Sequence, residues 1–233
     1  MTGNLKLRTD IGQTDKYIDY ITNTYDIDVD KFSTTTIPLI DKHELENIEW
    51  NIGLICGGSG SGKSTILKNQ FDKPLPIQYD ETKPIISQFP NLNEEEVCDI
   101  LESVGLSSVP TWLRKPHELS MGEKARLDIC WYLINTPNDK LLILDEFTST
   151  INREVAKSLS FALQRYIRKN NLKIVIASCH FDIIEFLQPD WIFNLNKKQN
   201  DKVELEYFRY TDSNYSNYPN VNKESILSNE YNI

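Results

Sequence analysis

A glycine- and serine-rich run that ends in a Lys-Ser pair carries the clearest chemical signal in the chain. Residues 57–64 fit the pattern G-x-x-x-x-G-K-[ST] at every position. Glycines let backbone N–H groups approach a phosphate closely, and the positive end of a helix that follows adds to the attraction. The residues expected to hold phosphates are Gly57, Gly58, Ser59, Gly60, Ser61, Gly62, Lys63, Ser64 and Thr65.

The last two residues of the pattern have separate roles. We expect the Lys63 ammonium to reach the β- and γ-phosphates of a nucleotide, and the Ser64 hydroxyl to bind Mg²⁺. The flanking sequence agrees, because an apolar run of strand type precedes the loop at 50–56 and residues 65–70 can open a helix. The alternative, a Gly/Ser-rich linker, does not account for these flanks.

Two adjacent acidic residues form the second chemical feature. Asp145 and Glu146 follow the apolar run 141–144, which is typical of a buried parallel strand. The ligand crevice of an α/β sheet lies at the carboxyl ends of its strands. Asp145 therefore suits a Mg²⁺ contact beside Ser64, and Glu146 suits a base that positions and deprotonates an attacking water. The alternative, a solvated acidic loop, becomes weaker once a phosphate loop precedes the pair.

Composition limits the function classes. The 233 residues suffice for one domain, or for a core with a small subdomain. A formal net charge of −9 argues against a globally basic nucleic-acid binder, although a local basic stripe stays possible. No apolar run approaches the roughly 20 residues of a transmembrane helix. The first residues lack the apolar region of a signal peptide, so we expect a cytoplasmic protein.

The four cysteines are far apart and lie in apolar runs. Their spacing favours neither a zinc site nor a disulfide framework, and small buried thiols are expected instead. They are Cys56, Cys98, Cys130 and Cys179.

Strand-like and helix-like patterns alternate along the middle of the chain, which predicts an α/β fold with a parallel sheet. Residues 31–56 resemble two or three strands. Buried strands are predicted at 141–144 and 173–177. The first predicted helix begins at Asn93 and ends at Gly105. The second runs from about Ser120 to Asn135, with Leu127, Cys130, Trp131 and Ile134 on one face. The third runs from Arg153 to Lys169.

Further motifs occur in a fixed order around the phosphate loop. Gln88 follows the loop, and residues 119–124 read L-S-M-G-E-K at the start of a predicted helix. Residues 145–152 read D-E-F-T-S-T-I-N, and His180 follows the strand at 173–177. Together with the loop, these elements resemble the Q-loop, signature, Walker B with D-loop, and switch histidine of ABC-type ATPases over roughly residues 30–200.

The resemblance implies an ABC-type P-loop fold. Its parts are a central, mostly parallel sheet, an N-terminal antiparallel β part and a short helical subdomain. We expect an ATPase domain over 1–206, with the helical insert at about 91–135, and a C-terminal extension over 207–233.

The resemblance also implies a mechanism with ATP and Mg²⁺ as ligands. ABC domains bind ATP between two head-to-tail subunits, so Ser120 and Gly122 would contact the γ-phosphate of the partner's nucleotide. Gln88 would sense the metal and the attacking water, and His180 would hold the γ-phosphate. The implied metal site comprises Ser64, Gln88 and Asp145, and the implied catalytic residues are Glu146, His180 and Gln88.

Several positions depart from the family pattern. Met121 stands at the first signature glycine, Glu123 at the signature glutamine and Asn152 at the D-loop aspartate. For an aromatic residue that stacks on adenine, Phe32 is a candidate and Tyr25 follows it, although both are more readily explained as core residues.

The work driven by ATP stays open between different classes of partner. Only 32 positions separate Gln88 from Ser120, fewer than in most transporter ATPases, and residues 179–191 resemble soluble ABC ATPases of bacteria and phages, some fused to an acetyltransferase-like domain. This favours a soluble dimeric ATPase that acts on nucleic acid or protein, and the basic residues Arg114, Lys115, Lys124 and Arg126 could form a local patch. One alternative is the nucleotide-binding subunit of a transporter with a separate membrane protein. A third is a binding module without turnover, suggested by Met121 and Asn152.

Overall fold

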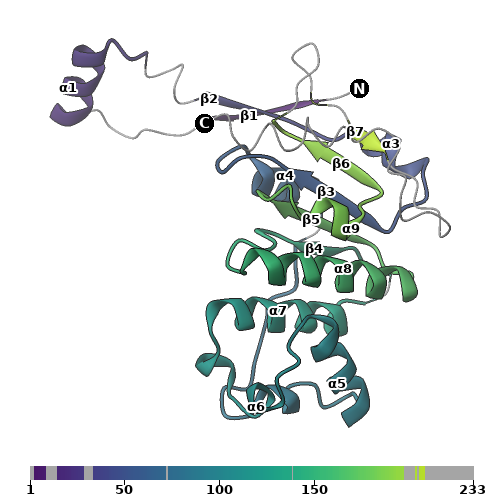
Figure 1. Cartoon of the computed structure of the whole chain (residues 1–233). Coiled ribbons are helices and arrows are strands. Elements are labelled where there is room, and N and C mark those ends of the chain that lie inside the picture. Colours follow the sequence, from purple (N-terminus) through teal and green to yellow (C-terminus); the bar gives the residue numbers. More distant parts are fainter. Residues whose placement is uncertain are drawn as a thin grey trace.

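The computed structural model describes residues 3–8, 15–28, 34–71, 73–137, 139–196, 203 and 205–207. Figure 1 shows a central sheet with helices stacked away from it. The sheet has the strand order β4-β5-β3-β6-β7, in which β7 alone is antiparallel to its neighbour. These strands are β3 (Ile52–Cys56), β4 (Leu142–Leu144), β5 (Ile174–Ser178), β6 (Trp191–Asn194) and β7 (Leu205–Tyr207).

A separate two-stranded antiparallel sheet is formed by β1 (Asn4–Arg8) and β2 (Thr34–Pro38). The observed architecture confirms the predicted α/β class, with a mostly parallel sheet and an N-terminal antiparallel part.

Both faces of the central sheet are covered, because successive side chains of a strand point to opposite faces. Ile52, Leu54 and Cys56 of β3 belong to the larger core cluster, whereas Ile55 belongs to the smaller one. The larger cluster includes α5 (Glu94–Ser103), α7 (Met121–Asn135), α8 (Arg153–Lys169) and α9 (Ile184–Leu187). The smaller cluster includes β2, α3 (Lys42–Glu46) and α4 (Lys63–Gln70).

The helical part lies on the far side of α8 from the sheet. In Figure 1, α7 lies next to α8, and α5 and α6 (Val109–Trp112) lie beyond α7. Two short 3₁₀ turns, η1 (Ile85–Ser87) and η2 (Pro116–Glu118), lie in the connections.

Side-chain caps fix where the helices near the predicted site begin. Asn93 and Glu96 form a reciprocal capping box at α5, and Ser120 and Glu123 form another at α7. The Asn152 side chain accepts a hydrogen bond from the N–H of Glu154 at the start of α8. All three predicted helices are therefore observed at their predicted starts.

The described residues of 31–56 contain two strands, within the predicted two or three, and the N-terminal half also contains helices that the sequence did not predict. Within residues 31–56 the structure has β2 and β3 with the short helix α3 between them, and α1 (Lys16–Tyr25) precedes them. No residue of α1 is buried, and the helix lies apart from the sheet in Figure 1. The interpretation of Tyr25 as a core residue is wrong, because 68% of it is exposed. Phe32 lies outside the described residues, as does the predicted extension 207–233 beyond Tyr207.

The buried face of α7 also differs in part from the predicted one. Leu127 and Cys130 are fully buried, but Trp131 and Ile134 are only partly buried, and Ile129 and Leu133 complete the buried set. The Trp131 indole donates to the carbonyl of Gln78, which keeps one edge of the ring at the surface.

The four cysteines are all free, and the prediction of buried thiols holds for two of them. Cys56 and Cys130 are buried, and Cys98 and Cys179 are partly buried. None of the helices in the described ranges is both long enough and apolar enough to cross a bilayer.

Gly53 on β3 provides a test of the sheet packing. It pairs with Trp191 of β6, and a Cβ atom at this glycine would lie 1.9 Å from the indole ring. We expect Gly53→Ala to lower the free energy of unfolding by about 1–3 kcal/mol, because Trp191 is fully buried and cannot move aside easily. Urea unfolding measures the loss.

The matched control is Gly3→Ala, where the nearest atom to an added Cβ is Leu39 Cδ1 at 3.9 Å. Equal stability of the two variants would contradict the packing assigned to Trp191.

Candidate functional site

The glycine-rich loop connects β3 to α4 at the carboxyl edge of the parallel sheet, where α/β folds bind ligands. Two of its glycines are required by their surroundings. Gly62 has a φ of +98°, and a Cβ there would lie 2.9 Å from Ile37 Cδ1. A Cβ on Gly57 would lie 2.9 Å from Leu195 Cβ. The loop therefore sits tightly on β2 and on the end of β6.

The loop presents a set of unpaired donors. The backbone N–H groups of Gly62, Lys63, Ser64 and Thr65 meet no acceptor within the described part of the chain, as expected at the first turn of a helix. The buried Ser61 hydroxyl likewise has no hydrogen-bond partner among the described residues. Such a concentration of donors at a helix N-terminus fits a phosphate group.

Lys63 lies over the same loop. Its ammonium donates to the carbonyl oxygens of Gly57 and Gly58, at 2.8 and 2.7 Å. A Cβ on Gly60 would meet no atom within 4 Å, so the tip of the loop is open. The predicted residues Ser59 and Thr65 belong to the same loop and helix start.

The structure brings the loop and the acidic pair together. The Ser64 hydroxyl donates to Asp145 Oδ1 at 3.0 Å, although 81 positions separate the two residues. The contact arises because β5 pairs in parallel with both β3 and β4, so the loops that follow β3 and β4 emerge at one edge. A hydroxyl and a carboxylate are hard oxygen donors of the kind that Mg²⁺ takes together with nucleotide phosphates.

No larger cluster of ligating side chains supports an all-protein metal site. Across the described ranges, no group of three or more His, Cys, Asp or Glu residues could hold a metal ion. The Ser64–Asp145 pair therefore fits Mg²⁺ in the way that nucleotide sites do, with few protein ligands.

The turn after β4 is strained and firmly anchored. Glu146 has a φ of +52° and Thr148 a φ of +68°, a region that L-residues rarely adopt. The N–H of Phe147 donates to the carbonyl of Ala177 at 2.9 Å, and the Phe147 ring is buried. The turn is thus fixed to the end of β5, and it leaves the Glu146 side chain exposed beside Asp145.

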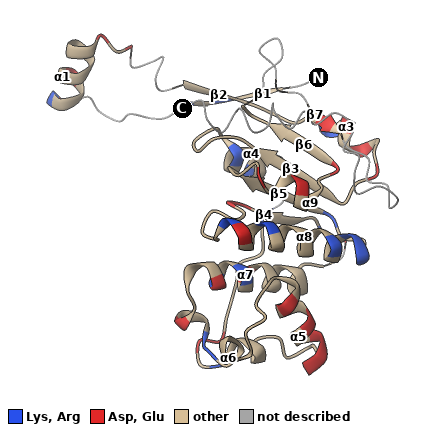
Figure 2. Cartoon of the chain, in the orientation of Figure 1, with Lys and Arg blue, Asp and Glu red and all other residues tan. Residues whose placement is uncertain are grey.

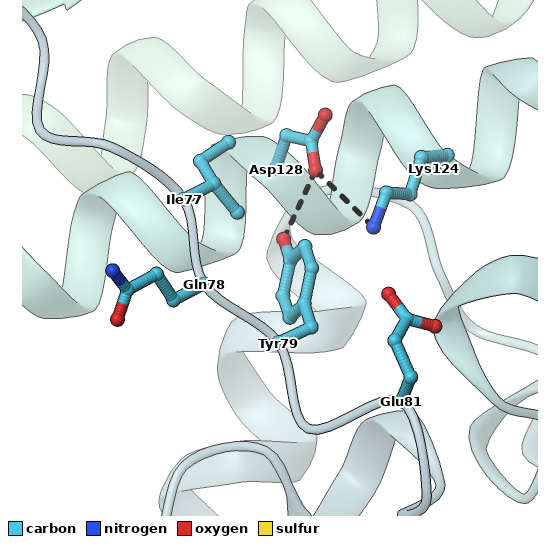
Figure 3. Close-up of a pocket in the computed structure, with 6 residues that line it drawn as sticks. All are labelled: Ile77, Gln78, Tyr79, Glu81, Lys124 and Asp128. Atoms are coloured by element: carbon cyan, nitrogen blue, oxygen red, sulfur yellow. Dashed lines mark hydrogen bonds and ion pairs between the residues drawn. The ribbon is translucent and has the colours of Figure 1, made fainter.

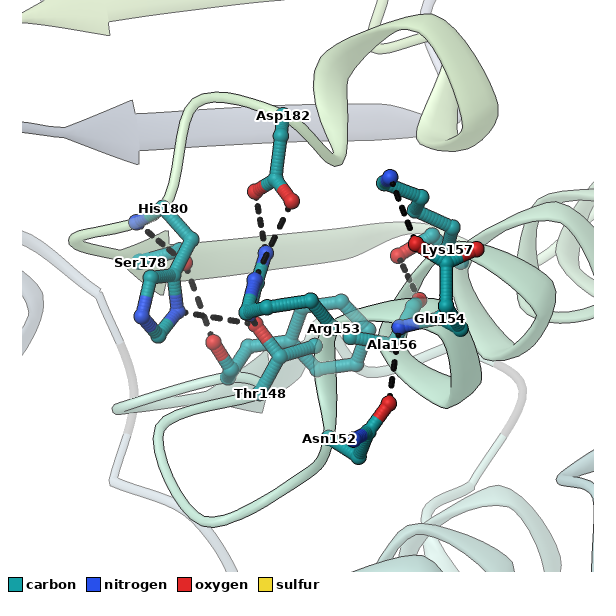
Figure 4. A network of polar contacts seen from close by, with 11 residues as sticks. Thr148, Asn152, Arg153, Glu154, Ala156, Lys157, Ser178, His180 and Asp182 are labelled. Atoms are coloured by element: carbon teal, nitrogen blue, oxygen red, sulfur yellow. Dashed lines mark hydrogen bonds and ion pairs between the residues drawn. The ribbon is translucent and has the colours of Figure 1, made fainter. Parts of the chain in front are cut away.

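His180 is linked to this turn through a polar network that Figure 4 shows. The ring nitrogen Nδ1 lies 3.2 Å from the Thr148 hydroxyl, and the backbone N–H of His180 donates to Ser178 Oγ. Arg153 donates to Thr148 Oγ1 at 3.3 Å and forms an ion pair with Asp182. Two predicted elements of the site, the residues after β4 and the histidine after β5, therefore share one network.

Burial is the main reason why the pKa of His180 lies below its usual value. The positive charges of Arg153 and Lys63 lower this pKa further, against the opposing effect of Asp182. These effects favour the neutral form of the imidazole.

The signature residues lie at the start of α7. The Ser120 hydroxyl donates to Glu123 Oε2 at 2.7 Å, and Glu123 also contacts Arg114. A Cβ on Gly122 would lie 3.3 Å from the carbonyl oxygen of Thr150, so the helix start packs against the D-loop of the same chain. Met121 is 73% exposed at this end.

Gln88 is the predicted site residue that the structure does not bring to the Ser64–Asp145 pair. Its side-chain oxygen accepts from the N–H of Asp80, and its amide nitrogen donates to the carbonyls of Asp80 and Lys83. In this conformation the amide closes the turn over residues 80–84 rather than facing a metal.

Three residues of the network were not singled out as site residues from the sequence. Thr148 lies within the recognised D-loop run but had no role of its own, and Arg153 was only the start of a helix. Asp182 follows the histidine by two positions, with no spacing that indicates a pairing with Arg153.

An open pocket of about 660 Å³ lies between the segment that leads to Gln88 and helix α7 (Figure 3). The Tyr79 hydroxyl donates to Asp128 at 3.0 Å, and the Lys124 ammonium lies 3.7 Å from the centre of the Tyr79 ring. Burial raises the pKa of Asp128, against the hydrogen bond from Tyr79 and the charge of Lys124. The pocket walls thus join the Q-loop segment to the signature helix.

Curated proteins similar to this chain are transporter and import ATP-binding proteins. The chain is 32% identical over 117 residues to the energy-coupling factor transporter ATP-binding protein EcfA of Methanothermobacter thermautotrophicus, covering 50% of this chain and 36% of that protein. It is 26% identical over 164 residues to the methionine import ATP-binding protein MetN of Clostridium tetani, covering 67% and 48%. The chain thus spans less than half the length of these relatives. No family model matches it.

Solved structures show the same fold. A dimeric post-hydrolysis structure of the ATP-binding cassette MJ0796 with ADP and phosphate matches with a TM-score of 0.55 at 14% identity, covering 90% of this chain and 99% of that one. CbiO1 of Clostridium perfringens, part of an ABC transporter complex, matches with a TM-score of 0.51 at 21% identity, covering 79% and 82%. The chain is therefore homologous to the ATP-binding proteins EcfA and MetN over the matched residues, and it has the fold of an ABC cassette.

Proposed function

We propose that this chain binds ATP with Mg²⁺ and hydrolyses it between two head-to-tail copies. The observation that carries the proposal is the 3.0 Å contact between Ser64 and Asp145 beside four backbone N–H groups without acceptors in the described chain. One edge of the sheet thus holds N–H groups that can donate to phosphate, a pair of hard oxygen ligands and the exposed carboxylate of Glu146.

Each of these groups has a place in attack of water on the γ-phosphate. The loop N–H groups and Lys63 hold the phosphate oxygens, and their fixed positions stabilise the charge that develops during transfer. Mg²⁺ held by Ser64 and Asp145 would neutralise part of that charge. Glu146 serves as the base that orients the water and accepts its proton, since its carboxylate is exposed beside Asp145.

A second copy would complete the site. Ser120 and Gly122 open α7, a helix of 15 residues whose positive end favours an anion. Within one chain Gly122 packs against Thr150 of the D-loop, so the signature and the turn that carries Glu146 form one connected surface. The fold-level match to a dimeric cassette supports a head-to-tail pair.

The structure weakens the nucleic-acid hypothesis. Arg114 is paired with Glu123, Lys124 lies over Tyr79, and Arg126 donates to the carbonyls of Gly105 and Gly122. Of the four basic residues suggested as a local patch, Lys115 is exposed, and its charge acts on the neighbouring carboxylate of Glu118. Figure 2 shows acidic residues along α5.

We therefore favour a protein partner. The relatives are transporter ATP-binding proteins, which supports a membrane subunit as that partner, ahead of the stand-alone phage-type enzyme. The pocket in Figure 3 is a suitable contact surface, because its walls belong to the Gln88 segment and to the signature helix. A partner bound there would contact the segment before Gln88 and the signature helix together.

Removal of the loop lysine tests phosphate binding. We expect Lys63→Ala to abolish turnover and to weaken ATP binding strongly, because Lys63 is the one loop side chain that carries a positive charge to the phosphates. Titration with a fluorescent ATP analogue measures binding, and phosphate release measures turnover. Lys68→Ala is the control, since Lys68 is exposed on the same helix. Unchanged activity in Lys63→Ala would refute the assigned site.

Neutralising the proposed base tests hydrolysis and dimer formation together. Glu146→Gln keeps the shape of the side chain but cannot accept a proton, so turnover should fall by about a hundredfold or more while ATP still binds. The bound ATP should then hold two chains together, and light scattering after size exclusion should report twice the monomer mass with MgATP. Glu154→Gln on α8 is the matched control. A monomer at saturating MgATP would exclude the sandwich dimer for the isolated chain.

The choice of partner is tested by turnover at low salt with and without duplex DNA. Low salt favours any phosphate contact, because such contacts weaken steeply as salt rises. We expect no stimulation by DNA, since most of the suggested basic patch is engaged within the chain. Stimulation that Lys115→Glu removes would instead make nucleic acid the partner.

A further inference from the structure

We infer that Thr148 and Arg153 are positioning residues that hold His180 in the tautomer with its proton on Nε2. The inference rests on the proposed function, in which His180 acts at the γ-phosphate. A chain of hydrogen bonds runs from Asp182 through Arg153 and Thr148 to the His180 ring (Figure 4). This chain decides which ring nitrogen carries the proton and can donate.

The direction of each hydrogen bond follows from the donor inventory. An arginine guanidinium carries donors and no acceptor, so Thr148 Oγ1 must accept in its 3.3 Å contact with Arg153 Nη1. The hydroxyl hydrogen of Thr148 is then available for its other neighbour, His180 Nδ1, at 3.2 Å. If Thr148 donates there, Nδ1 is the bare nitrogen and the proton of a neutral ring is on Nε2.

The opposite tautomer leaves a polar hydrogen without a partner. With a proton on Nδ1, the Thr148 oxygen would accept from both Arg153 and His180, and its own hydrogen would need a third group. Thr148 is only 3% exposed, and the described residues offer it no other acceptor. A buried hydroxyl without an acceptor is unfavourable, so the network selects the Nε2–H form.

Asp182 fixes the arginine that begins this chain. Arg153 bonds to both carboxylate oxygens of Asp182 through Nε and Nη2, and such a planar fork sets the direction of the remaining donor, Nη1. Asp182 follows His180 by two positions, and Arg153 is the first residue of α8. The pair therefore joins the start of α8 to the loop that carries the histidine.

The charge state of the ring agrees with this arrangement. The charged groups that act on His180 are Arg153, Asp182 and Lys63, and together with burial they lower the pKa of His180. A neutral ring has one proton, so the position of that proton decides what the ring can do.

The backbone at Thr148 is a second indication of a positional role. Thr148 is β-branched and has a φ of +68°, a conformation that such residues rarely adopt. A strained backbone conformation persists only where the surrounding structure holds the residue in place, and such residues are frequent at functional sites. Here the strained residue places its hydroxyl between Arg153 and His180.

The consequence is a donor available for the nucleotide. In the described chain Nε2 of His180 contacts no acceptor, while Nδ1 is occupied by Thr148. An Nε2–H group can donate to a phosphate oxygen, whereas a bare Nε2 would repel it.

Nitrogen NMR of the full chain, labelled with ¹⁵N-histidine and free of nucleotide, tests the tautomer directly. The ring nitrogen without a proton has a distinct chemical shift, and the missing signal in His180→Gln identifies this ring among the three histidines. We expect Nδ1 to be the bare nitrogen above the pKa of the ring. A bare Nε2 in the wild-type protein would overturn the inference, whatever the enzyme's turnover.

Variants test the two positioning residues. Thr148→Val removes the hydroxyl but keeps the branched shape, and Arg153→Met removes the guanidinium; both should give a mixture of tautomers. Each should lower kcat by about twofold for an even mixture, with little change in KM for ATP, because only the fraction of rings with the proton on Nε2 can perform the role of His180. Thr148→Ser should restore the wild-type tautomer and most of kcat.

Arg165→Met is the matched control for Arg153→Met, because Arg165 is exposed on the same helix. A wild-type tautomer in both Thr148→Val and Arg153→Met would refute the inference even if kcat fell. Absent turnover in the wild-type protein would refute the proposed function, and the NMR result would still decide the tautomer.

Discussion

The parallel pairing of β5 with β3 on one side and β4 on the other is the constraint on which the site depends. Its backbone hydrogen bonds align Ser178 with Cys56 and Ile176 with Leu144, so the loops after all three strands emerge at one edge. The phosphate loop, the acidic turn and the histidine loop follow these strands in turn. Ser64 can therefore bond to Asp145, and the turn after β4 can be fastened to the end of β5.

A second feature of the site is that some of its residues adopt backbone conformations that they rarely prefer. Glu146 and Thr148 have positive φ angles, and Phe147 between them has a buried ring and a backbone N–H that donates to the carbonyl of Ala177. The cost of this backbone is offset by the core, since Phe147 packs in the larger hydrophobic cluster. The sheet thus holds the acidic turn in a backbone conformation that is unfavourable for Glu146 and Thr148 in isolation.

Much of the core fold was predictable, because strong periodicity and explicit caps mark it. Asn93 and Ser120 indicate helix starts, and the apolar runs before Gly57 and Asp145 predict buried strands. The phosphate loop and its pairing with Asp145 were predictable for the same reason. The helix α3 was missed because its five residues are too short for a periodic signal.

The polar network could not be predicted, because the pairing of Arg153 with Asp182 is a long-range contact without a sequence pattern.

The central claim is that one chain supplies only half of an ATP site, and specific activity measured across protein concentration tests it most directly. ATP turnover per chain should rise with concentration from the nanomolar to the micromolar range and then level off, because two copies must meet before Ser120 and Gly122 can reach the partner's nucleotide. A turnover per chain that stays constant from the lowest concentration, with a monomeric mass throughout, would contradict the account.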